Sequence, residues 1–272
     1  MAKINLDKYY TDINIAKHCI SKTYEIIGVE NITEVIEPSA GNGSFSNLIN
    51  GFSNDFNGCI SYDIEPEHSS IIKQDFLKLE LLYKKGRLII GNPPFGNKNL
   101  LAMKFFKKST EFSDYISFIL PISQYNNNQQ MFEFDLIYSE DLGKKAYSGI
   151  DVHCCLNIYK RPIDGINTKA KSYKLKDITI KEVRKSRNQF LPENFIFDYS
   201  LCTWGDLGKI PNKQGEFNQE AYIKVNNNIL KDKVLDCLKN AKWIELYKME
   251  RSPRLKQWQI LKHLKENVIE LR

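Results

Sequence analysis

Across the first 160 residues, short apolar runs alternate with segments whose apolar residues recur at helical spacing. The runs have the length and content of buried strands and cover residues 33–37, 58–62, 87–91 and 115–121. Helical patterns follow from about residue 45 and over residues 97–110. Strands and helices that alternate in this way form a parallel sheet with helices on its faces. The pattern therefore predicts an α/β fold.

The end of this pattern suggests where the first domain stops. Residues 134–138 and 152–159 read as an antiparallel pair that closes the sheet. The segment Arg161-Pro162-Ile163-Asp164-Gly165 then breaks the alternation. We therefore predict a domain over residues 1–164 and a smaller region over 165–272. In that region we expect a strand at 173–183, irregular chain at 190–211 and helices at 227–238 and 255–271.

The net charge of +6 is unevenly distributed. Residues 1–165 carry 17 Lys and Arg against 20 Asp and Glu, and residues 166–272 carry 22 against 13. The first part is therefore at −3 and the rest at +9. A lysine-rich solvated surface gives such an excess, and so does a module that faces a polyanion.

Composition excludes several classes of protein. A chain of 272 residues with 42% hydrophobic and 26% charged residues is globular. Its longest apolar runs, such as residues 116–122, are too short to cross a bilayer, and its N-terminus lacks the apolar stretch of a signal peptide. We expect a cytoplasmic protein of a bacterial, phage or viral context. Six cysteines without Cys-x-x-Cys spacing predict free thiols, and four scattered histidines predict no metal site.

Acidic residues follow the first two predicted strands. Glu37 opens the loop Glu37-Pro38-Ser39-Ala40-Gly41-Asn42-Gly43-Ser44-Phe45, in which glycine lets the backbone approach a ligand closely. Asp63 ends the second strand, where a carboxylate can take both hydroxyls of a ribose. Asp75 can accept from an adenine amino group, with Phe76 against the ring. So much negative charge suits a cationic cofactor such as S-adenosylmethionine better than a pyrophosphate.

Asn92-Pro93-Pro94-Phe95 follows the strand at residues 87–91, at the edge where open α/β sheets bind ligands. An exocyclic amine on a base is a poor nucleophile because its lone pair is delocalised into the ring. The Asn92 side-chain oxygen and the Pro93 carbonyl are two acceptors that can draw the amine toward tetrahedral geometry. The prolines stiffen this arrangement, and Phe95 can stack on the base. An ordinary strand-ending turn has the same residues.

Together, residues 1–160 resemble S-adenosylmethionine-dependent N6-adenine DNA methyltransferases. Residues 37–45 resemble the cofactor loop of that family, and Asn92–Phe95 resembles its catalytic Asn/Asp-Pro-Pro-aromatic motif. Tyr9-Tyr10-Thr11 resembles the segment that packs on the methionine part of the cofactor. The order of these motifs, with a recognition region at the C-terminal end, resembles the gamma arrangement. The resemblance implies a Rossmann-like seven-stranded sheet whose last two strands form an antiparallel hairpin.

The resemblance also implies roles for individual residues. The implied catalytic loop is Asn92, Pro93, Pro94 and Phe95. The implied S-adenosylmethionine site comprises Tyr10, Thr11, Glu37, Pro38, Ser39, Ala40, Gly41, Gly43, Phe45, Asp63, Ile64, Asp75, Phe76 and Asn92. Tyr147, shortly before the predicted strand at 152–159, matches the family's aromatic residue that packs on the extruded adenine. With Phe95 it would clamp a flipped base.

The basic C-terminal region would then recognise the target. Its candidates for contacts with the DNA backbone are Lys169, Lys171, Lys174, Arg184, Lys185, Arg187, Arg251 and Arg254. Lysines suit phosphates, whereas arginines are the better candidates for base edges. Trp204, Trp243 and Trp258 also lie here, and each of them taken singly is more typical of a core.

The leading hypothesis is therefore transfer of a methyl group to adenine N6 in double-stranded DNA, by a monomer or weak dimer, as in restriction-modification. RNA adenine methylation by the same loop is the first alternative. Methylation of a protein glutamine is another, although those enzymes carry Asn-Pro-Pro-Tyr and usually an N-terminal substrate domain. A catalytically inactive DNA-binding homologue is the third.

Overall fold

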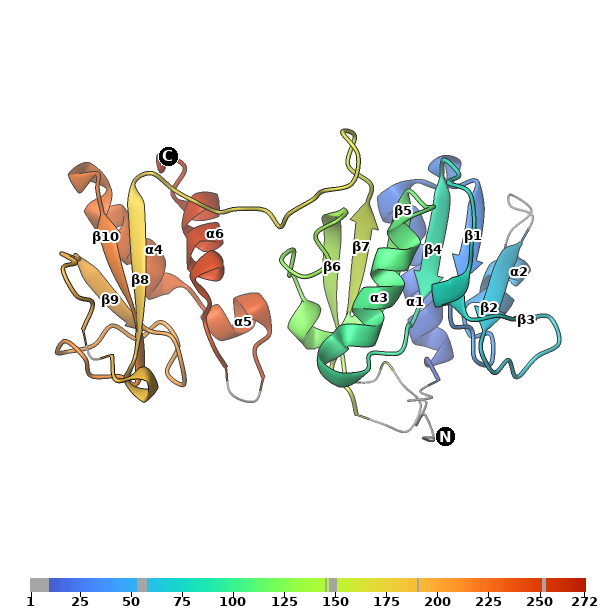
Figure 1. The fold of residues 1–272 in the computed structure, drawn as a ribbon, viewed down its shortest axis with the longest axis horizontal. Helices are drawn as coiled ribbons and strands as arrows, with labels where there is room; N and C mark the ends of the chain where they lie inside the picture. The colour runs from blue at the N-terminus through green and yellow to red at the C-terminus, as the bar shows by residue number, and fades with distance from the viewer. Residues whose placement is uncertain (1–9, 53–57, 145, 147–150, 190, 251–252) are drawn as a thin grey trace. The chain divides into compact units, whose positions relative to one another are not determined.

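A computed structural model describes residues 10–52, 58–144, 146, 151–189, 191–250 and 253–272 of the protein. The chain divides into two compact units, Met1–Lys171 and Ser172–Arg272 (Figure 1). The division lies at Lys171 rather than at residue 164. Residues beyond 164 stay bonded to the first unit, since Asn167 donates from its backbone N to the Glu133 carbonyl at 3.0 Å, and Gln129 Nε2 donates to the Lys171 carbonyl at 3.1 Å.

The first unit contains a seven-stranded sheet in the order β3-β2-β1-β4-β5-β7-β6. The strands are β1 (Glu34–Glu37), β2 (Cys59–Asp63), β3 (Ile72–Lys73), β4 (Arg87–Gly91), β5 (Tyr115–Pro121), β6 (Asp135–Gly143) and β7 (Cys154–Lys160). Pairings among β1 to β5 are parallel, whereas β7 runs antiparallel to both β5 and β6. This is the Rossmann-like sheet with a closing hairpin that the motif resemblance implies, and the prediction of the fold is confirmed.

Helices cover both faces of this sheet. On one face α1 (Ile13–Ile27) and α2 (Ser46–Phe52) pack with residues such as Val35 and Leu88, and on the other α3 (Leu100–Thr110) packs with residues such as Ile36 and Ile89. Figure 1 shows α3 in front of the sheet and α1 behind it. Consecutive residues of β1 and β4 thus pack in the cores on opposite faces of the sheet, as the alternation of side chains along a strand requires. The central strands are buried on both sides, which explains their continuously apolar sequences.

The start of α1 is fixed by its N-cap. The Asp12 carboxylate accepts hydrogen bonds from the backbone N of Asn14 at 2.9 Å and of Ile15 at 3.3 Å. An N-cap of this kind satisfies amides that have no partner within the helix. It begins α1 at Ile13, three residues after Tyr10, so the segment containing Tyr10 and Thr11 approaches the sheet from a defined direction.

The second unit has its own sheet, in the order β8-β10-β9, with every pairing antiparallel. Its strands are β8 (Ile178–Arg184), β9 (Tyr199–Cys202) and β10 (Gln219–Val225). Three helices follow, α4 (Lys231–Asn240), α5 (Trp243–Tyr247) and α6 (Gln257–Asn267). Residues at alternate positions, including Ile178, Ile180, Ala221 and Ile223, form one core with these helices.

Two sequence predictions for this unit need correction. The predicted strand at residues 173–183 begins only at Ile178. Tyr173 and Leu175 are buried in the core but do not pair in the sheet. The alternating apolar pattern at these residues therefore indicates burial and not a strand. Trp243 is buried and Trp258 packs against the core, as expected of core tryptophans, but Trp204 is 44% exposed.

The remaining expectations concern membranes, metals and thiols. No helix in the described part of the chain is long and apolar enough to cross a membrane. Among the described residues no group of His, Cys, Asp and Glu side chains is arranged to hold a metal ion. All six cysteines are free thiols, as predicted.

Candidate active site

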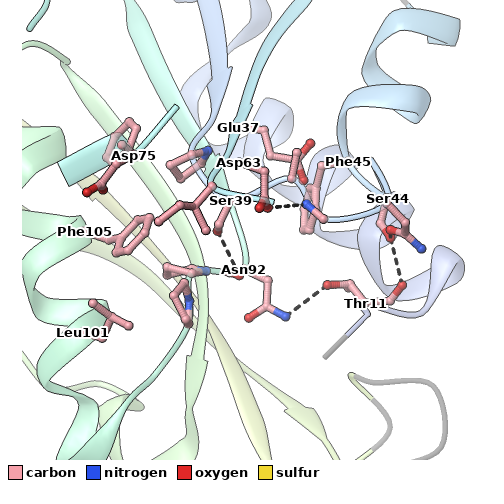
Figure 2. A pocket seen from close by; sticks show the side chains of 18 of the residues that line it. Thr11, Glu37, Ser39, Ser44, Phe45, Asp63, Asp75, Asn92, Leu101 and Phe105 are labelled. Atoms are coloured by element: carbon pink, nitrogen blue, oxygen red, sulfur yellow. Dashed lines mark hydrogen bonds between the residues drawn. The ribbon is translucent and has the colours of Figure 1, made fainter. Parts of the chain in front are cut away.

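A cavity of about 340 Å³ lies where β1, β2 and β4 end, at the carboxyl edge of the sheet. The lining residues come from the predicted motifs, from their neighbours in sequence and from α3, and are Tyr10, Thr11, Glu37, Pro38, Ser39, Ala40, Gly41, Asn42, Ser44, Phe45, Asp63, Ile64, Gln74, Asp75, Phe76, Leu77, Asn92, Pro93, Pro94, Phe95, Leu101 and Phe105. Figure 2 shows their side chains converging from the strand ends and from α3. The position agrees with the rule that open α/β sheets bind ligands at this edge.

Glu37, the last residue of β1, is the most deeply buried carboxylate of the cavity, at 2% exposure. Its Oε2 accepts a hydrogen bond from the backbone N of Ser46, the first residue of α2, at 2.9 Å. Burial nevertheless dominates and raises the pKa of Glu37 to about 8, with the negative charge of Asp63 acting in the same direction. A positive charge placed in the cavity would favour the ionised carboxylate.

Asp63, the last residue of β2, holds the loop that follows β1. Its Oδ2 accepts from the backbone N of Gly41 at 2.7 Å, and its Oδ1 accepts from the backbone N of Glu65 at 2.8 Å. The Tyr10 ring covers the same loop, since a Cβ on Gly41 would lie 3.8 Å from Tyr10 Cε1. The Tyr10 hydroxyl in turn donates to Glu67. Each carboxylate oxygen of Asp63 keeps acceptor capacity for a further donor.

Asp75 and Phe76, which follow Asp63 in the sequence, also line the cavity. Asp75 Oδ1 accepts from the backbone N of Leu77 at 3.0 Å, and its Oδ2 lies 3.6 Å from Lys78 Nζ. Phe76 is 2% exposed and stacks on Phe105 of α3 with 5.5 Å between ring centroids. This pair forms an apolar wall of the cavity that suits a flat ring.

The loop Asn92–Phe95 follows β4 directly and forms the other side of the cavity. Asn92 Nδ2 donates to Thr11 Oγ1 at 3.1 Å, and Ser39 Oγ donates to the Asn92 carbonyl at 3.3 Å. Figure 2 shows the amide nitrogen of Asn92 toward Thr11 and its oxygen on the opposite side. With the nitrogen on Thr11, Asn92 Oδ1 is oriented to accept from a donor in the cavity.

The far end of this loop is anchored to α3. The Phe95 carbonyl accepts from the backbone N of Leu101 at 3.2 Å and of Ala102 at 3.4 Å. Lys98 and Asn99 adopt left-handed conformations, with φ of 53° and 64°, and Asn99 Nδ2 donates to Ser123 Oγ at 3.1 Å. The loop is therefore held at both ends by hydrogen bonds, beyond what Pro93 and Pro94 restrict by themselves.

Most of the residues predicted for the cofactor and catalytic sites line one cavity, and among the described ones the exception is Gly43. Gly43 belongs to the same loop but does not line the cavity. It adopts a φ of +82° and a Cβ there would meet Asn47 Nδ2 at 2.9 Å, so its role is the turn itself. Tyr147 and Tyr9 lie outside the described residues. The placement of an aromatic partner for Phe95 therefore stays a prediction.

Six lining residues were absent from the prediction, namely Asn42, Ser44, Gln74, Leu77, Leu101 and Phe105. Four of these are neighbours in sequence of predicted residues, so extending each motif by one position would have included them. Leu101 and Phe105 belong to the predicted helix after Phe95, four positions apart and thus on one face. Part of this apolar face borders the cavity.

The basic residues predicted for DNA contact belong to both units. Lys169 and Lys171 are exposed at the end of the first unit, and Lys174 and Arg187 are exposed in the second. Lys185 Nζ donates to the Glu216 carbonyl at 3.4 Å, and Arg184 and Arg254 both approach Glu182. Arg251 lies outside the described residues. Residues 172–272 carry 20 Lys and Arg against 13 Asp and Glu, so the positive excess belongs to the second unit.

No protein-family model matches the sequence, and no curated protein matches it. Solved structures are similar to its first unit in fold. A candidate RNA methyltransferase from Pyrococcus horikoshii matches with a TM-score of 0.46 and 16% identity, over 60% of this chain and 91% of that one. A candidate class I S-adenosylmethionine-dependent methyltransferase from Listeria monocytogenes matches with a TM-score of 0.46 and 13% identity, over 63% and 66%.

The 23S rRNA methyltransferase ErmE is a third similar structure, with a TM-score of 0.41 and 12% identity over 58% of this chain and 71% of that one. Identities and TM-scores this low indicate a likeness in fold alone and say nothing about the substrate or the reaction.

Proposed function

We propose that the cavity binds S-adenosylmethionine. Its carboxylates support this, because Asp63 and Asp75 lie at neighbouring strand ends and a bound cation would favour the ionised form of the buried Glu37. The sulfonium of this cofactor carries a positive charge that such a site favours over an anionic pyrophosphate. Asp63 suits the ribose hydroxyls, and the Phe76–Phe105 wall suits the adenine ring.

We further propose that the reaction is transfer of a methyl group to the N6 amine of adenine. The observation that carries this proposal is the bond between Asn92 and Thr11, which directs the amide oxygen away from Thr11 in a cavity that also contains the carboxylates. Asn92 Oδ1 and the Pro93 carbonyl would accept the two amine hydrogens, and Phe95 would stack on the base. S-adenosylmethionine would supply the methyl group and leave as the neutral thioether.

The chain's own residues position the amine and need not form a covalent bond with the base. Two acceptors at fixed positions localise the nitrogen lone pair and stabilise the positive charge that develops as the new carbon–nitrogen bond forms. The amine proton is then lost to solvent through the same acceptors. The loop's anchors at Thr11, Ser39 and Leu101 keep this geometry fixed before the substrate arrives.

We propose double-stranded DNA as the substrate. The second unit carries the excess of Lys and Arg that binding to a phosphate backbone requires. A base paired in a duplex cannot reach a cavity of this kind, so the target adenine would be flipped out of the stack. In single-stranded DNA the base is already unpaired, so single-stranded DNA would be a substrate as well.

The experiment is methyl transfer from radiolabelled S-adenosylmethionine to duplex DNA, single-stranded DNA, total RNA and protein in parallel. We expect label in duplex DNA for the full-length protein and none for Asn92→Ala, whose affinity for the cofactor stays within a few-fold. Asn14→Ala, which changes an exposed asparagine of α1, is the matched control and should be fully active.

Other outcomes would redirect the assignment. Label confined to RNA would establish the RNA alternative, and label in protein would establish glutamine methylation. Full activity of Asn92→Ala would contradict the proposed role of the loop. Calorimetry that detects no binding of S-adenosylmethionine would favour an inactive DNA-binding protein.

A further inference from the structure

At the end of β8 in the second unit, two arginines converge on one carboxylate. Arg184 Nη2 lies 3.2 Å and Arg254 Nη2 lies 3.6 Å from Glu182 Oε2. One carboxylate cannot neutralise two guanidinium groups, so the cluster keeps a net positive charge. The Arg254 side chain is 39% exposed against 21% for Arg184, which makes Arg254 the more accessible of the two.

An exposed tryptophan lies beside this cluster. Trp204 and Arg254 form an antiparallel bridge, which Leu255 extends by donating from its backbone N to the Thr203 carbonyl at 2.9 Å. Directly opposed residues of an antiparallel pair have side chains on the same face. The Trp204 carbonyl also accepts from Cys202 Sγ at 3.0 Å. The bridge therefore puts an indole that is 44% exposed on the same face as the Arg254 side chain.

Arg254 also has hydrogen-bonding capacity that the described residues do not use. Its Nε is buried and has no partner among them. Buried polar groups are almost always bonded, so a donor in this state needs an explanation. A guanidinium has five N–H groups, and within the described part of the chain one nitrogen of Arg254 is found near an acceptor. Each terminal nitrogen carries two N–H groups, so Arg254 can offer Nη1 and the second N–H of Nη2 as a forked pair of donors while Nη2 keeps its contact with Glu182. The buried Nε takes no part in this fork.

We propose that Arg254 reads a guanine of the target DNA, with Glu182 and Arg184 as positioning residues and Trp204 packed against the neighbouring nucleotide. This proposal rests on DNA being the substrate in the proposed function. The guanine edge in the major groove offers two acceptors, O6 and N7, that match the arginine fork. The sequence offers Arg254 among several arginines that suit the backbone or base edges, and the cluster gives this one a role in specificity.

The Glu182 carboxylate is what distinguishes a base contact from a phosphate contact. A carboxylate within 3.6 Å of the reading group would repel an approaching phosphate, which reduces the value of the guanidinium as a backbone contact. A guanine edge carries no net charge, so the same carboxylate costs little and holds the fork in one orientation. An exposed lysine such as Lys174, for which the described residues provide no ion pair, fits a phosphate better.

The test is selection of bound duplexes from a random-sequence library with the full-length protein, Arg254→Gln and Lys174→Gln. We expect the wild type to enrich a motif that contains guanine, and Arg254→Gln to lose the preference at that position by about 5- to 150-fold. Lys174→Gln removes the same charge, and it should bind all sequences more weakly while keeping the motif. A wild-type preference without guanine, no preference at all, or an unchanged motif in Arg254→Gln would overturn the proposal.

Further variants separate reading from folding. Arg254→Lys keeps the charge but not the fork, and it should also relax the preference at the guanine position. Glu182→Gln should relax the preference for guanine at the same position, and Glu182→Asp should restore part of that preference. If Glu182 had a structural role alone, its substitution would lower thermal stability without changing the selected motif. Methylation of the selected duplexes is measured separately. A guanine preference without methyl transfer would contradict the proposed reaction and leave the reading role of Arg254 standing.

Discussion

Asn92 Nδ2 donates to Thr11 Oγ1 over 3.1 Å, although the two residues are 81 positions apart. The same threonine accepts a hydrogen bond at its carbonyl from Ser44 Oγ at 3.3 Å, and the Asn92 carbonyl accepts from Ser39 Oγ at the same distance. The N-terminal segment, the loop after β1 and the loop after β4 are thus one hydrogen-bonded unit. The orientation of the Asn92 amide depends on Thr11.

Thr11→Val should therefore reduce methyl transfer without abolishing cofactor binding. Valine matches the shape of threonine but removes the acceptor for Asn92 Nδ2. We expect kcat to fall by about threefold to tenfold, the value of one hydrogen bond. Steady-state kinetics and calorimetry with S-adenosylmethionine measure the two effects separately. Thr11→Ser keeps the hydroxyl and should retain most of the activity, and equal losses in both variants would contradict this role.

Asp63→Asn should weaken cofactor binding selectively. Asparagine can still accept from the Gly41 amide, so the loop after β1 keeps its anchor, although the bond from the Glu65 amide is lost. The cavity also loses one negative charge. Hydrogen bonds to an ionised acceptor are about twice as strong as neutral ones, and we expect about a tenfold loss of affinity in calorimetry. Glu80→Gln changes an exposed carboxylate of the same unit and serves as the control. Unchanged affinity in Asp63→Asn would argue against a ribose contact.

Glu37→Gln should change how stability depends on pH. The pKa of Glu37 rises from an ordinary value of 4.5 to about 8, because burial disfavours the charged carboxylate. Between these values the unfolded chain loses a proton that the folded chain keeps, so the wild type loses stability as pH rises from about 4.5 to 8. The slope is at most about 1.4 kcal/mol per pH unit. Below pH 4.5 the carboxyl is protonated in both states and contributes no slope.

Thermal melting of the wild type and Glu37→Gln across this range, without cofactor, checks that prediction. The gap between the two melting temperatures should shift steadily in favour of Glu37→Gln up to about pH 8 and then stop changing. Parallel curves from pH 5 to 8 would show that Glu37 ionises normally in the folded protein.

Two glycines of the first unit should respond oppositely to alanine. Gly43 has a φ of +82° and lies close to the Asn47 side chain, so Gly43→Ala should cost about 1–2 kcal/mol of unfolding free energy. Gly51 lies in α2, where a Cβ would meet no atom of the described residues within 4 Å. Gly51→Ala should therefore stabilise the protein by about 0.5–1 kcal/mol. Urea denaturation of both variants gives the comparison, and equal effects would contradict the assigned turn.

The strands of the first unit were the most predictable part of the fold. β4 and β5 begin and end at the predicted residues, because strands buried on both faces have continuously apolar sequences. β3 has only two residues and both are exposed, so it leaves no pattern to detect. In the second unit β10 was missed, since its polar residues Gln219, Glu220 and Lys224 mask a buried strand.

The candidate site was predictable where chemistry follows directly after a strand. Glu37, Asp63 and Asn92 each follow or end a recognisable strand, so their meeting at one edge is a consequence of the parallel sheet. The bond from Asn92 to Thr11 depends instead on where the segment before α1 enters the sheet. The grouping of Glu182, Arg184 and Arg254 likewise requires the pairing of Trp204 with Arg254, which no local pattern encodes.

The most direct test of the account is the identity of the methylated nucleoside. Duplex DNA is incubated with the full-length protein and isotope-labelled S-adenosylmethionine, digested to nucleosides and analysed by mass spectrometry, with Asn92→Ala in parallel. We expect labelled N6-methyladenine with the wild type and none with Asn92→Ala. Label on cytosine, or the same yield of N6-methyladenine from both proteins, would contradict it.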